Sequence, residues 1–168
     1  MTADQLDRAE RCEARRRAQR RNLFGRVQAA ASASRTQAQR LLRAKGDLSI
    51  TEWRVLWDLA EAGPLTVTEM ASIQRTDHAL VSRAVPSLAK KGLVTTTTGA
   101  DDRRTSSVAL TPAGRSAFEA TAGTMSARRA ALAATFSQAE MDTFLDLIGR
   151  FERFVEGPVP PLAETGGA

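Results

Sequence analysis

The sequence predicts a mainly α-helical fold with one small β-hairpin, and two observations carry this prediction. Apolar residues recur at helical spacing in several segments, three of which begin with the pattern S/T-x-x-E. In that pattern a hydroxyl and a carboxylate bind backbone N–H groups that the first helical turn leaves without partners. The segment from Leu93 to Leu110 differs, because β-branched residues flank a charged turn, as in a pair of strands. A chain of 168 residues is long enough to bury one core of its own.

The charge balance is basic, with 24 Lys and Arg against 19 Asp and Glu and a pI near 10.5. Arginine supplies 21 of the basic residues, and its guanidinium suits paired hydrogen bonds to phosphate and to guanine. A GC-rich genome explains the same arginine excess equally well. The positions of the charges must therefore decide whether nucleic acid is the partner.

Residue types that several other functions need are scarce. Cys12 is the only cysteine, so we expect no intrachain disulfide and a reducing, cytoplasmic compartment. There is no run of 18 apolar residues, and the N-terminus lacks the apolar segment of a signal peptide. With His78 as the only histidine and no tyrosine, little remains for acid–base catalysis or metal binding. We therefore expect that the protein is not an enzyme and that it binds no cofactor and no metal ion.

Residues 1–21 are a basic extension in which arginines are interleaved with acidic residues. A solvated helix crossed by ion pairs and a mobile arm on DNA phosphates both fit, and the helix is favoured because helix formers dominate. In residues 22–47 apolar positions return, among them Leu23 and Val27. This segment is predicted to be an N-terminal dimerisation helix, packed on a helix from a second copy.

Residues 48–115 are predicted to form a winged helix-turn-helix lobe. S/T-x-x-E patterns at Ser49 and Thr66 begin its first two helices. Thr76 is the predicted N-cap of a third helix, which ends near Lys91 before Gly92 and has this apolar face: Leu80, Val81, Ala84, Val85 and Leu88. A helix followed at once by a charged hairpin is typical of the winged helix-turn-helix, a DNA-reading device.

Residues 116–156 are predicted to supply the C-terminal dimerisation helices. Thr111-Pro112 begins a helix that should run to about Thr135 and loosen at Gly123. The last helix, Ala139 to Val155, follows a third S/T-x-x-E pattern at Ser137. Its apolar stripe is wider than one domain's own surface needs, which predicts a homodimer interface through Phe144, Ile148, Phe151 and Val155. Residues 157–168 are expected to form a disordered tail.

The central stretch resembles the multiple-antibiotic-resistance-regulator (MarR) family of winged-helix transcription factors. The resemblance covers about Leu48 to Arg115 and rests on L-S-I-T-E-W-R-V-L from Leu48, G-P-L-T from Gly63, V-S-R from Val81, K-G-L-V from Lys91, D-R-R from Asp102 and L-T-P-A-G-R from Leu110. It implies a homodimer whose terminal helices interlock and whose two lobes straddle a palindromic operator. It also implies a repressor bound to nucleoid DNA and released by a small phenolic or anionic effector or, in one branch of the family, by thiol oxidation.

The predicted DNA contacts lie on the third helix and on the wing. The V-S-R match favours base contacts by Ser82 and Arg83, whereas the basic residues at the helix ends suit phosphates. The predicted DNA-binding residues are Thr66, Arg75, Thr76, Asp77, His78, Ala79, Ser82, Arg83, Lys90, Lys91, Arg103 and Arg104. Asp101 or Asp102 should pair with one wing arginine and keep the turn rigid. Pro86 is expected to bend the helix, because it lacks an N–H and crowds the carbonyl of Ser82.

Trp53, Arg54 and Trp57 are the predicted effector residues, because the resemblance implies a pocket beside them. Trp53 also fits the core, Trp57 also fits a dimer contact, and Arg54 also fits a solvated surface. Two alternative functions stay open. Cys12 among arginines suits a thiol sensor, although it lacks the apolar helix and tyrosine partners of the family's sensing cysteines. A winged helix used only for protein contact is the other alternative, and the paired arginines of the wing argue against it.

Overall fold

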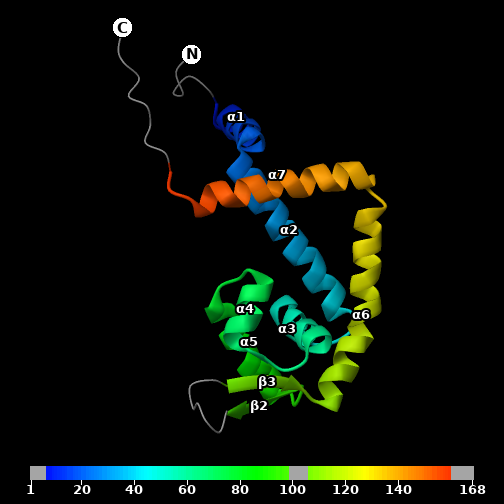
Figure 1. The fold of residues 1–168 in the computed structure, drawn as a ribbon. Coiled ribbons are helices and arrows are strands. Elements are labelled where there is room, and N and C mark those ends of the chain that lie inside the picture. The colour runs from blue at the N-terminus through cyan, green and yellow to red at the C-terminus, as the bar shows by residue number, and fades with distance from the viewer. Residues whose placement is uncertain (1–6, 99–105, 160–168) are drawn as a thin grey trace. The chain divides into compact units, whose positions relative to one another are not determined.

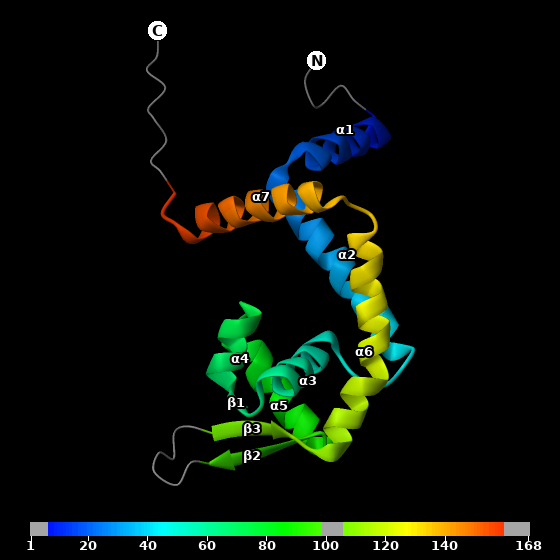
Figure 2. The ribbon, with the colours of Figure 1, turned by 45° about the vertical axis from the view of Figure 1, so that its right-hand side comes forward.

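The computed structural model describes residues 7–98 and 106–159 (Figures 1 and 2). The chain divides into two compact units, residues 1–125 and 126–168, and each is described by itself. The elements in chain order are α1 (Arg8–Arg21), α2 (Leu23–Arg43), α3 (Ile50–Ala62), β1 (Leu65–Thr66), α4 (Val67–Gln74), α5 (His78–Lys90), β2 (Val94–Thr98), β3 (Ser106–Leu110), α6 (Pro112–Ala133) and α7 (Gln138–Glu156). The predicted class, mainly helical with a small β-hairpin, is confirmed.

Several helices begin with a reciprocal pair of cap hydrogen bonds. In α3 the N–H of Ser49 donates to Oε2 of Glu52 at 2.7 Å, and the N–H of Glu52 donates to Oγ of Ser49 at 3.2 Å. The same box begins α4 at Thr66 and α7 at Ser137, so all three predicted boxes are confirmed. Asp7 begins α1 with a further box, which a search restricted to Ser and Thr does not find.

Helices α1 and α2 meet at Asn22, which ends one helix and begins the next. The N–H of Asn22 donates to the carbonyl of Gln19 at 3.2 Å, and its side-chain Oδ1 accepts from the N–H of Gly25 at 3.0 Å. No residue of α1 is buried, and its Arg16 pairs with Glu13 at 3.6 Å. The arginines of α1 are therefore exposed in this chain, and the choice between a solvated helix and an arm on DNA stays open.

The core of the first unit lies among α3, α4, α5 and the sheet (Figure 1). The end of α2 belongs to it as well, since Ala38 and Leu42 are buried. Between them Gln39 joins α2 to α3, because its side chain donates to the carbonyl of Leu48 and accepts from the N–H of Ile50, each at 3.0 Å. The larger fully buried side chains are Leu42, Leu56, Leu59, Met70, Leu88, Val55, Val81 and Val108.

The sheet has the strand order β1-β3-β2 and is antiparallel throughout. Strands β2 and β3 form the predicted hairpin, with Val94 opposite Leu110. The two-residue strand β1 pairs with β3 through Leu65 opposite Val108, and sequence reasoning missed it. Two residues are too few to show the alternation of polar and apolar positions by which strands are recognised.

The start of α6 is fastened to the start of the hairpin. The hydroxyl of Thr111 donates to the carbonyl of Gly92 at 2.8 Å and accepts from the N–H of Gly114 at 2.9 Å. A Cβ at Gly114 would lie 1.9 Å from the carbonyl oxygen of Leu93, so only glycine permits this approach. Helix α6 then continues as one helix through Gly123, and the loosening expected there stays a prediction.

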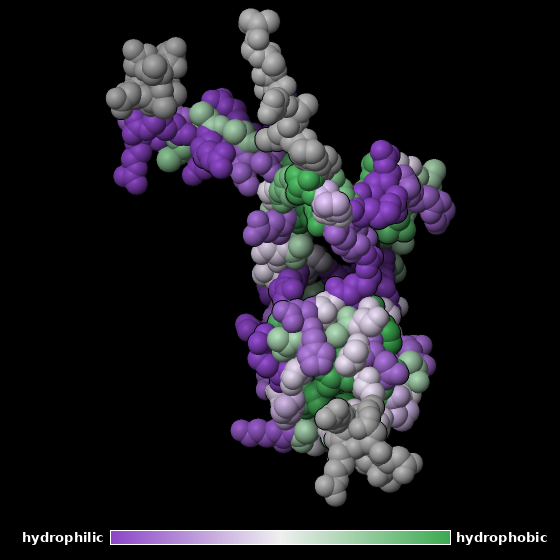
Figure 3. Space-filling view, turned by 60° about the vertical axis from the view of Figure 1, so that its left-hand side comes forward, coloured by the Kyte–Doolittle hydropathy of each residue, from purple (hydrophilic) through white to green (hydrophobic). Residues whose placement is uncertain are grey.

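The second unit contains the end of α6 and helix α7. Among residues 126–159 none is buried, although α7 has a strongly one-sided apolar pattern. Phe136 and Phe144 stack with their ring centroids 6.5 Å apart beside a shallow apolar depression lined also by Leu147. Hydrophobic side chains reach the surface where α7 ends (Figure 3), including Phe154 and Val155. This unit has little apolar interior of its own.

Candidate nucleic-acid interface

Helix α5 has one face in the core and the other toward water. Its buried side chains are Val81, Ala84, Val85 and Leu88, as the periodicity predicts. On the opposite side His78, Ser82, Arg83 and Lys90 are exposed. Because the buried face limits the rotation of the helix about its axis, the exposed face is turned away from the core.

The first turn of α5 is capped by Asp77, and the predicted cap at Thr76 is wrong. Oδ1 of Asp77 accepts from the N–H of Ala79 at 2.8 Å. Thr76 instead belongs to the end of α4, since its N–H donates to the carbonyl of Ala71 at 3.1 Å. Arg75 makes this turn possible by adopting a left-handed backbone, with φ of 48°. The closing of α4 therefore moves the next cap one residue along the chain.

Residue Pro86 lies within α5, which continues as one helix from His78 to Lys90. The side chain of Pro86 is exposed, so its ring does not displace the buried stripe. The bend expected at the carbonyl of Ser82 stays a prediction.

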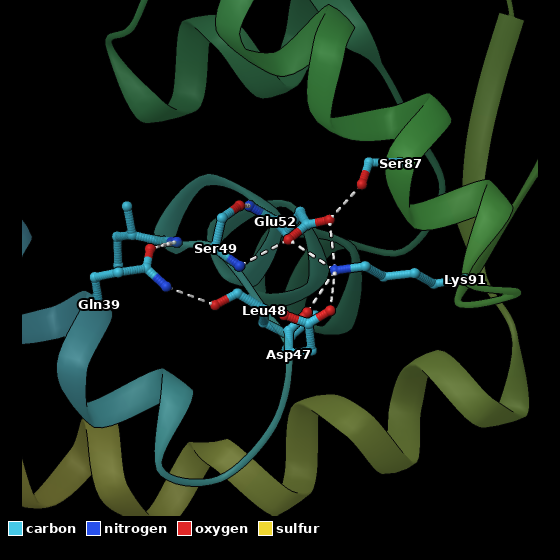
Figure 4. Close-up of polar contacts among 8 residues, drawn as sticks. Gln39, Asp47, Leu48, Ser49, Glu52, Ser87 and Lys91 are labelled. Carbon is cyan, nitrogen blue, oxygen red and sulfur yellow. Dashed lines mark hydrogen bonds and ion pairs between the residues drawn. The ribbon is translucent and has the colours of Figure 1, made fainter.

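The two lysines after the α5 stripe have different surroundings. Lys90 is exposed at the last residue of α5. The ammonium of Lys91 lies 3.0 Å from Oε1 and 3.2 Å from Oε2 of Glu52, and it also donates to the carbonyl of Asp47 (Figure 4). Ser87 joins this cluster, with its hydroxyl donating to Oε1 of Glu52 at 2.7 Å. Lys91, predicted to contact phosphate, thus has its charge directed into the protein.

The pKa of Glu52 lies below its ordinary value. Burial by itself raises the pKa, but hydrogen bonds from the Ser49 amide, the Ser87 hydroxyl, the Lys91 ammonium and the Ser49 hydroxyl together outweigh it. The carboxylate is only 5% exposed and stays ionised because these donors surround it.

A second polar cluster joins α3 to the turn between α4 and α5. Arg54 donates from Nη2 to the carbonyl of Gln74 at 3.0 Å, which satisfies an orphan carbonyl at the end of α4. The amide of Gln74 donates to Oδ2 of Asp58 at 2.6 Å. Burial raises the pKa of Asp58, although the Gln74 hydrogen bond and the charge of Arg54 act in the opposite direction.

The predicted effector residues do not share one environment. Trp53 is 3% exposed in the core, with its ring centroid 5.0 Å from that of Trp57 and 6.3 Å from that of Phe118. Trp57 is half-buried, and Arg54 is engaged with Gln74. Trp53 therefore fits its core alternative, and effector contact by Arg54 would require it to leave the carbonyl of Gln74.

The remaining predicted positions are placed as follows. The hydroxyl of Thr66 is occupied by its own capping box, donating to Glu69 at 2.9 Å and accepting from its N–H at 3.1 Å. Of the predicted dimer residues, Leu23, Phe144 and Val155 are exposed, whereas Val27, Ile148 and Phe151 are half-buried. Four wing residues lie outside the described residues: Asp101, Asp102, Arg103 and Arg104.

Cys12 is an exposed free thiol on α1. Across residues 7–98 and 106–159, no group of three His, Cys, Asp or Glu side chains could hold a metal ion. In the same ranges, no helix combines the length and apolar character needed to cross a bilayer.

Sequence reasoning missed the two polar clusters that join α3 to the helix-turn-helix pair, one around Glu52 and one around Gln74. Glu52 was expected only as a cap of its own helix, yet it binds Ser87 and Lys91, which lie 35 and 39 residues further along the chain. Asp58 and Gln74 carry no motif at all. No local signal reveals such pairs, because their proximity exists only after the core has formed.

Comparisons with known proteins agree with the geometry. Residues 48–106 match the model of the MarR family. The HTH-type transcriptional repressor IacR of Pseudomonas putida is 32% identical over 79 residues, which are 47% of this chain and 47% of that protein. The chain thus spans about half the length of this curated relative.

Solved structures share the fold over more of the chain. A MarR/EmrR family transcriptional regulator from Acinetobacter sp. ADP1 is 25% identical with a TM-score of 0.70, covering 79% of this chain and 94% of that one. The PcaV regulator of Streptomyces coelicolor, solved with its natural ligand, shows the same fold at 18% identity and a TM-score of 0.68, covering 91% and 98%. Residues 48–106 thus match the MarR family of transcriptional regulators, and most of the chain has the fold of a solved regulator of that family.

Proposed function

We propose that this chain is a repressor that binds a pseudo-palindromic double-stranded DNA operator as a homodimer. The observation that carries the proposal is the exposed face of α5, on which Ser82 and Arg83 stand opposite the buried stripe. A helix held in this way by its lobe suits the major groove, where each base pair presents a distinct set of donors and acceptors. Repression is inferred from the P. putida relative, which is named as a repressor.

The residues of α5 divide by the chemistry they offer. Arg83 has the planar guanidinium that suits a guanine edge, and Ser82 can donate to or accept from any base. His78 and Lys90, at the two ends of the helix, suit phosphates. Asp77 contributes through its cap, because a carboxylate beside a phosphate would be repelled. Thr66, Arg75, Thr76 and Ala79 stay predictions as DNA contacts, whereas the ammonium of Lys91 is engaged with Glu52.

The central experiment compares two exposed arginines of the first unit. Arg83→Ala should weaken operator binding by about 1–3 kcal/mol and relax preference at one or two base positions. Arg35→Ala, a matched charge removal on α2, should change binding little. Fluorescence anisotropy on a small library of operator variants would measure both effects. Equal losses for the two variants, without any change in base preference, would refute direct reading by α5.

The wing arginines are proposed to act differently from α5. We assign Arg104 to the minor groove and expect Arg103 to pair with Asp101 or Asp102, following the D-R-R segment of the family resemblance. A minor-groove arginine reads width and potential more than base identity. Arg104→Ala should therefore weaken all operator variants by a similar factor and lower the salt slope by about one unit.

Dimerisation is inferred from the apolar residues that the second unit leaves in water. Phe144 is 56% exposed and Val155 is 50% exposed on one helix. A two-fold axis would repeat α5 on the DNA, so the half-site centres should lie about 10 bp apart, one turn of the duplex. Leu23 at the start of α2 is a further proposed interface residue, since it is 59% exposed.

Release by a small effector is part of the proposal, supported by the fold shared with PcaV, which was solved with its natural ligand. A phenolic or other aromatic carboxylate is the proposed chemical class. Trp53 and Trp57, 5.0 Å apart, would report binding near α3 by their fluorescence. A panel of aromatic carboxylates should contain one that quenches this fluorescence and releases the operator together. If quenching and release never occur with the same compound, the effector site lies elsewhere.

A further inference from the structure

We propose that Glu52 is a positioning residue for DNA recognition, which sets the rotation of α5 through Ser87 and Lys91 without touching DNA. The inference rests on the proposed function. It also changes the role predicted for Lys91, which becomes part of the support for α5 instead of a contact to phosphate.

Glu52 forms its contacts with α5 and its own cap at the same time. Its Oε1 accepts from the Ser87 hydroxyl at 2.7 Å and lies 3.0 Å from the Lys91 ammonium. Its Oε2 accepts from the Ser49 N–H at 2.7 Å and from Lys91 at 3.2 Å. Figure 4 shows these side chains converging on the one carboxylate from α3 and α5. A displacement of α5 would therefore break contacts at both oxygens.

The same side of α5 also carries the residue proposed to read bases. Arg83, Ser87 and Lys91 are spaced four residues apart, so they follow one another along one side of the helix. Arg83, Ser87, Lys91 and Glu52 line one open depression between α3 and α5. A rotation of α5 by ~20° would move the Cα of Arg83 by about 1 Å and its guanidinium by more. The contacts of Ser87 and Lys91 with Glu52 resist this rotation, so they keep the Arg83 side chain in position for a base contact.

Burial explains why Lys91 stays with Glu52 when DNA is bound. The Glu52 side chain is 6% exposed, and the Lys91 side chain is 30% exposed. Removing the cation from a buried carboxylate is strongly unfavourable, whereas a solvent-exposed ion pair contributes little free energy. Lys90 lies outside this cluster and is exposed, so it provides a matched lysine for comparison.

The test measures operator affinity against salt concentration for wild type, Lys90→Met, Lys91→Met, Glu52→Gln and the double variant Glu52→Gln/Lys91→Met. Lys90→Met should lower the salt slope by about 0.9, the value for one lost phosphate contact. Lys91→Met and Glu52→Gln should each lower affinity roughly tenfold, about 1.4 kcal/mol, with the slope of the wild type. The double variant should recover part of the loss, because no charge is then left buried without its partner.

Glu52→Gln keeps the side-chain volume and one acceptor oxygen, for either the Ser49 N–H or the Ser87 hydroxyl, so it should fold even if Lys91→Met does not. Circular dichroism checks each variant. Folded variants that bind as tightly as wild type would reduce the cluster to a stabilising role and overturn the proposal. A lowered slope in Lys91→Met beside a neutral Glu52→Gln would overturn it in favour of a phosphate contact. If the wild type binds no DNA, the proposed function fails and this inference with it, whereas a wild type that binds tests the inference alone.

Discussion

Helices α3 and α7 start in the same way and end in different environments. Both follow a serine whose box is closed by a glutamate, Glu52 in α3 and Glu140 in α7. Helix α3 buries Trp53, Val55, Leu56 and Leu59, whereas α7 buries no residue in its unit. Local chemistry therefore fixes where a helix begins, but the rest of the chain decides whether its apolar face is covered. The exposed apolar face of α7 is the basis of the proposed dimer interface.

The largest loss of stability in this comparison should come from a substitution on the buried face of α3. Leu56 is fully buried, so Leu56→Ala should lower the free energy of unfolding by about 3 kcal/mol, from lost burial and a residual cavity. Urea denaturation followed by circular dichroism would measure it at two protein concentrations. The loss should be equal at both, since the cavity lies within one chain. A loss below 1 kcal/mol would mean that the core of the lobe is loosely packed.

A smaller and concentration-dependent effect is expected for α7. If α7 is the dimer interface, Phe144→Ala should raise the dissociation constant of the dimer about 30-fold, roughly 2 kcal/mol, because large aromatic side chains dominate such interfaces. Sedimentation velocity would show wild type at twice the chain mass of 18.1 kDa and the variant shifting toward one chain mass on dilution. Lys45→Ala, an exposed change outside α7, provides the control. A wild type that stays monomeric at micromolar concentration would remove α7 from this role.

The smallest expected effect is on the pH dependence of stability, to which the two cap glutamates Glu52 and Glu140 contribute. The pKa of Glu52 and that of Glu140 are both lowered in the fold, so each stabilises the protein above its unfolded value of 4.5. That stability is lost as the pH falls through the folded pKa. Thermal unfolding between pH 6 and 3 should therefore decline less steeply in Glu52→Gln than in wild type. Glu140→Gln should flatten the curve less, since Glu140 is fully exposed, and the reverse order would contradict the role given to Lys91 and Ser87.

The sequence predicts the elements of the lobe better than their contacts. The boxes at Ser49, Thr66 and Ser137 are correct, because both partners lie within three residues of each other. The apolar stripe of α5 is correct for the same reason, as helical spacing is a local property. The cap at Thr76 fails because the left-handed turn at Arg75 extends the end of α4 to Thr76, so that α5 begins one residue later with Asp77 as its cap.

In the candidate site, too, the sequence predicts local features but not contacts between distant residues. The exposure of Ser82 and Arg83 follows from the periodicity of their helix, and the sequence predicts it. The engagement of Lys91 with Glu52 and of Arg54 with Gln74 depends on packing between helices that are distant in sequence. Both of these residues were predicted as ligand contacts, since an isolated basic residue gives no sign of an intramolecular partner.

The close approach at Gly114 has a consequence for how this protein tolerates mutation over time. Any other residue there would collide with the backbone of Leu93, so random variation at this codon should be purged almost completely. Gly123, further along the same helix, is the opposite case, because a Cβ there meets nothing within 4 Å. Alanine at Gly123 should even stabilise the helix by about 1 kcal/mol, since glycine is a poor helix former. The two glycines of α6 should therefore differ in tolerance to substitution. The backbone of Leu93 restricts position 114 to glycine, whereas position 123 should accept other residues.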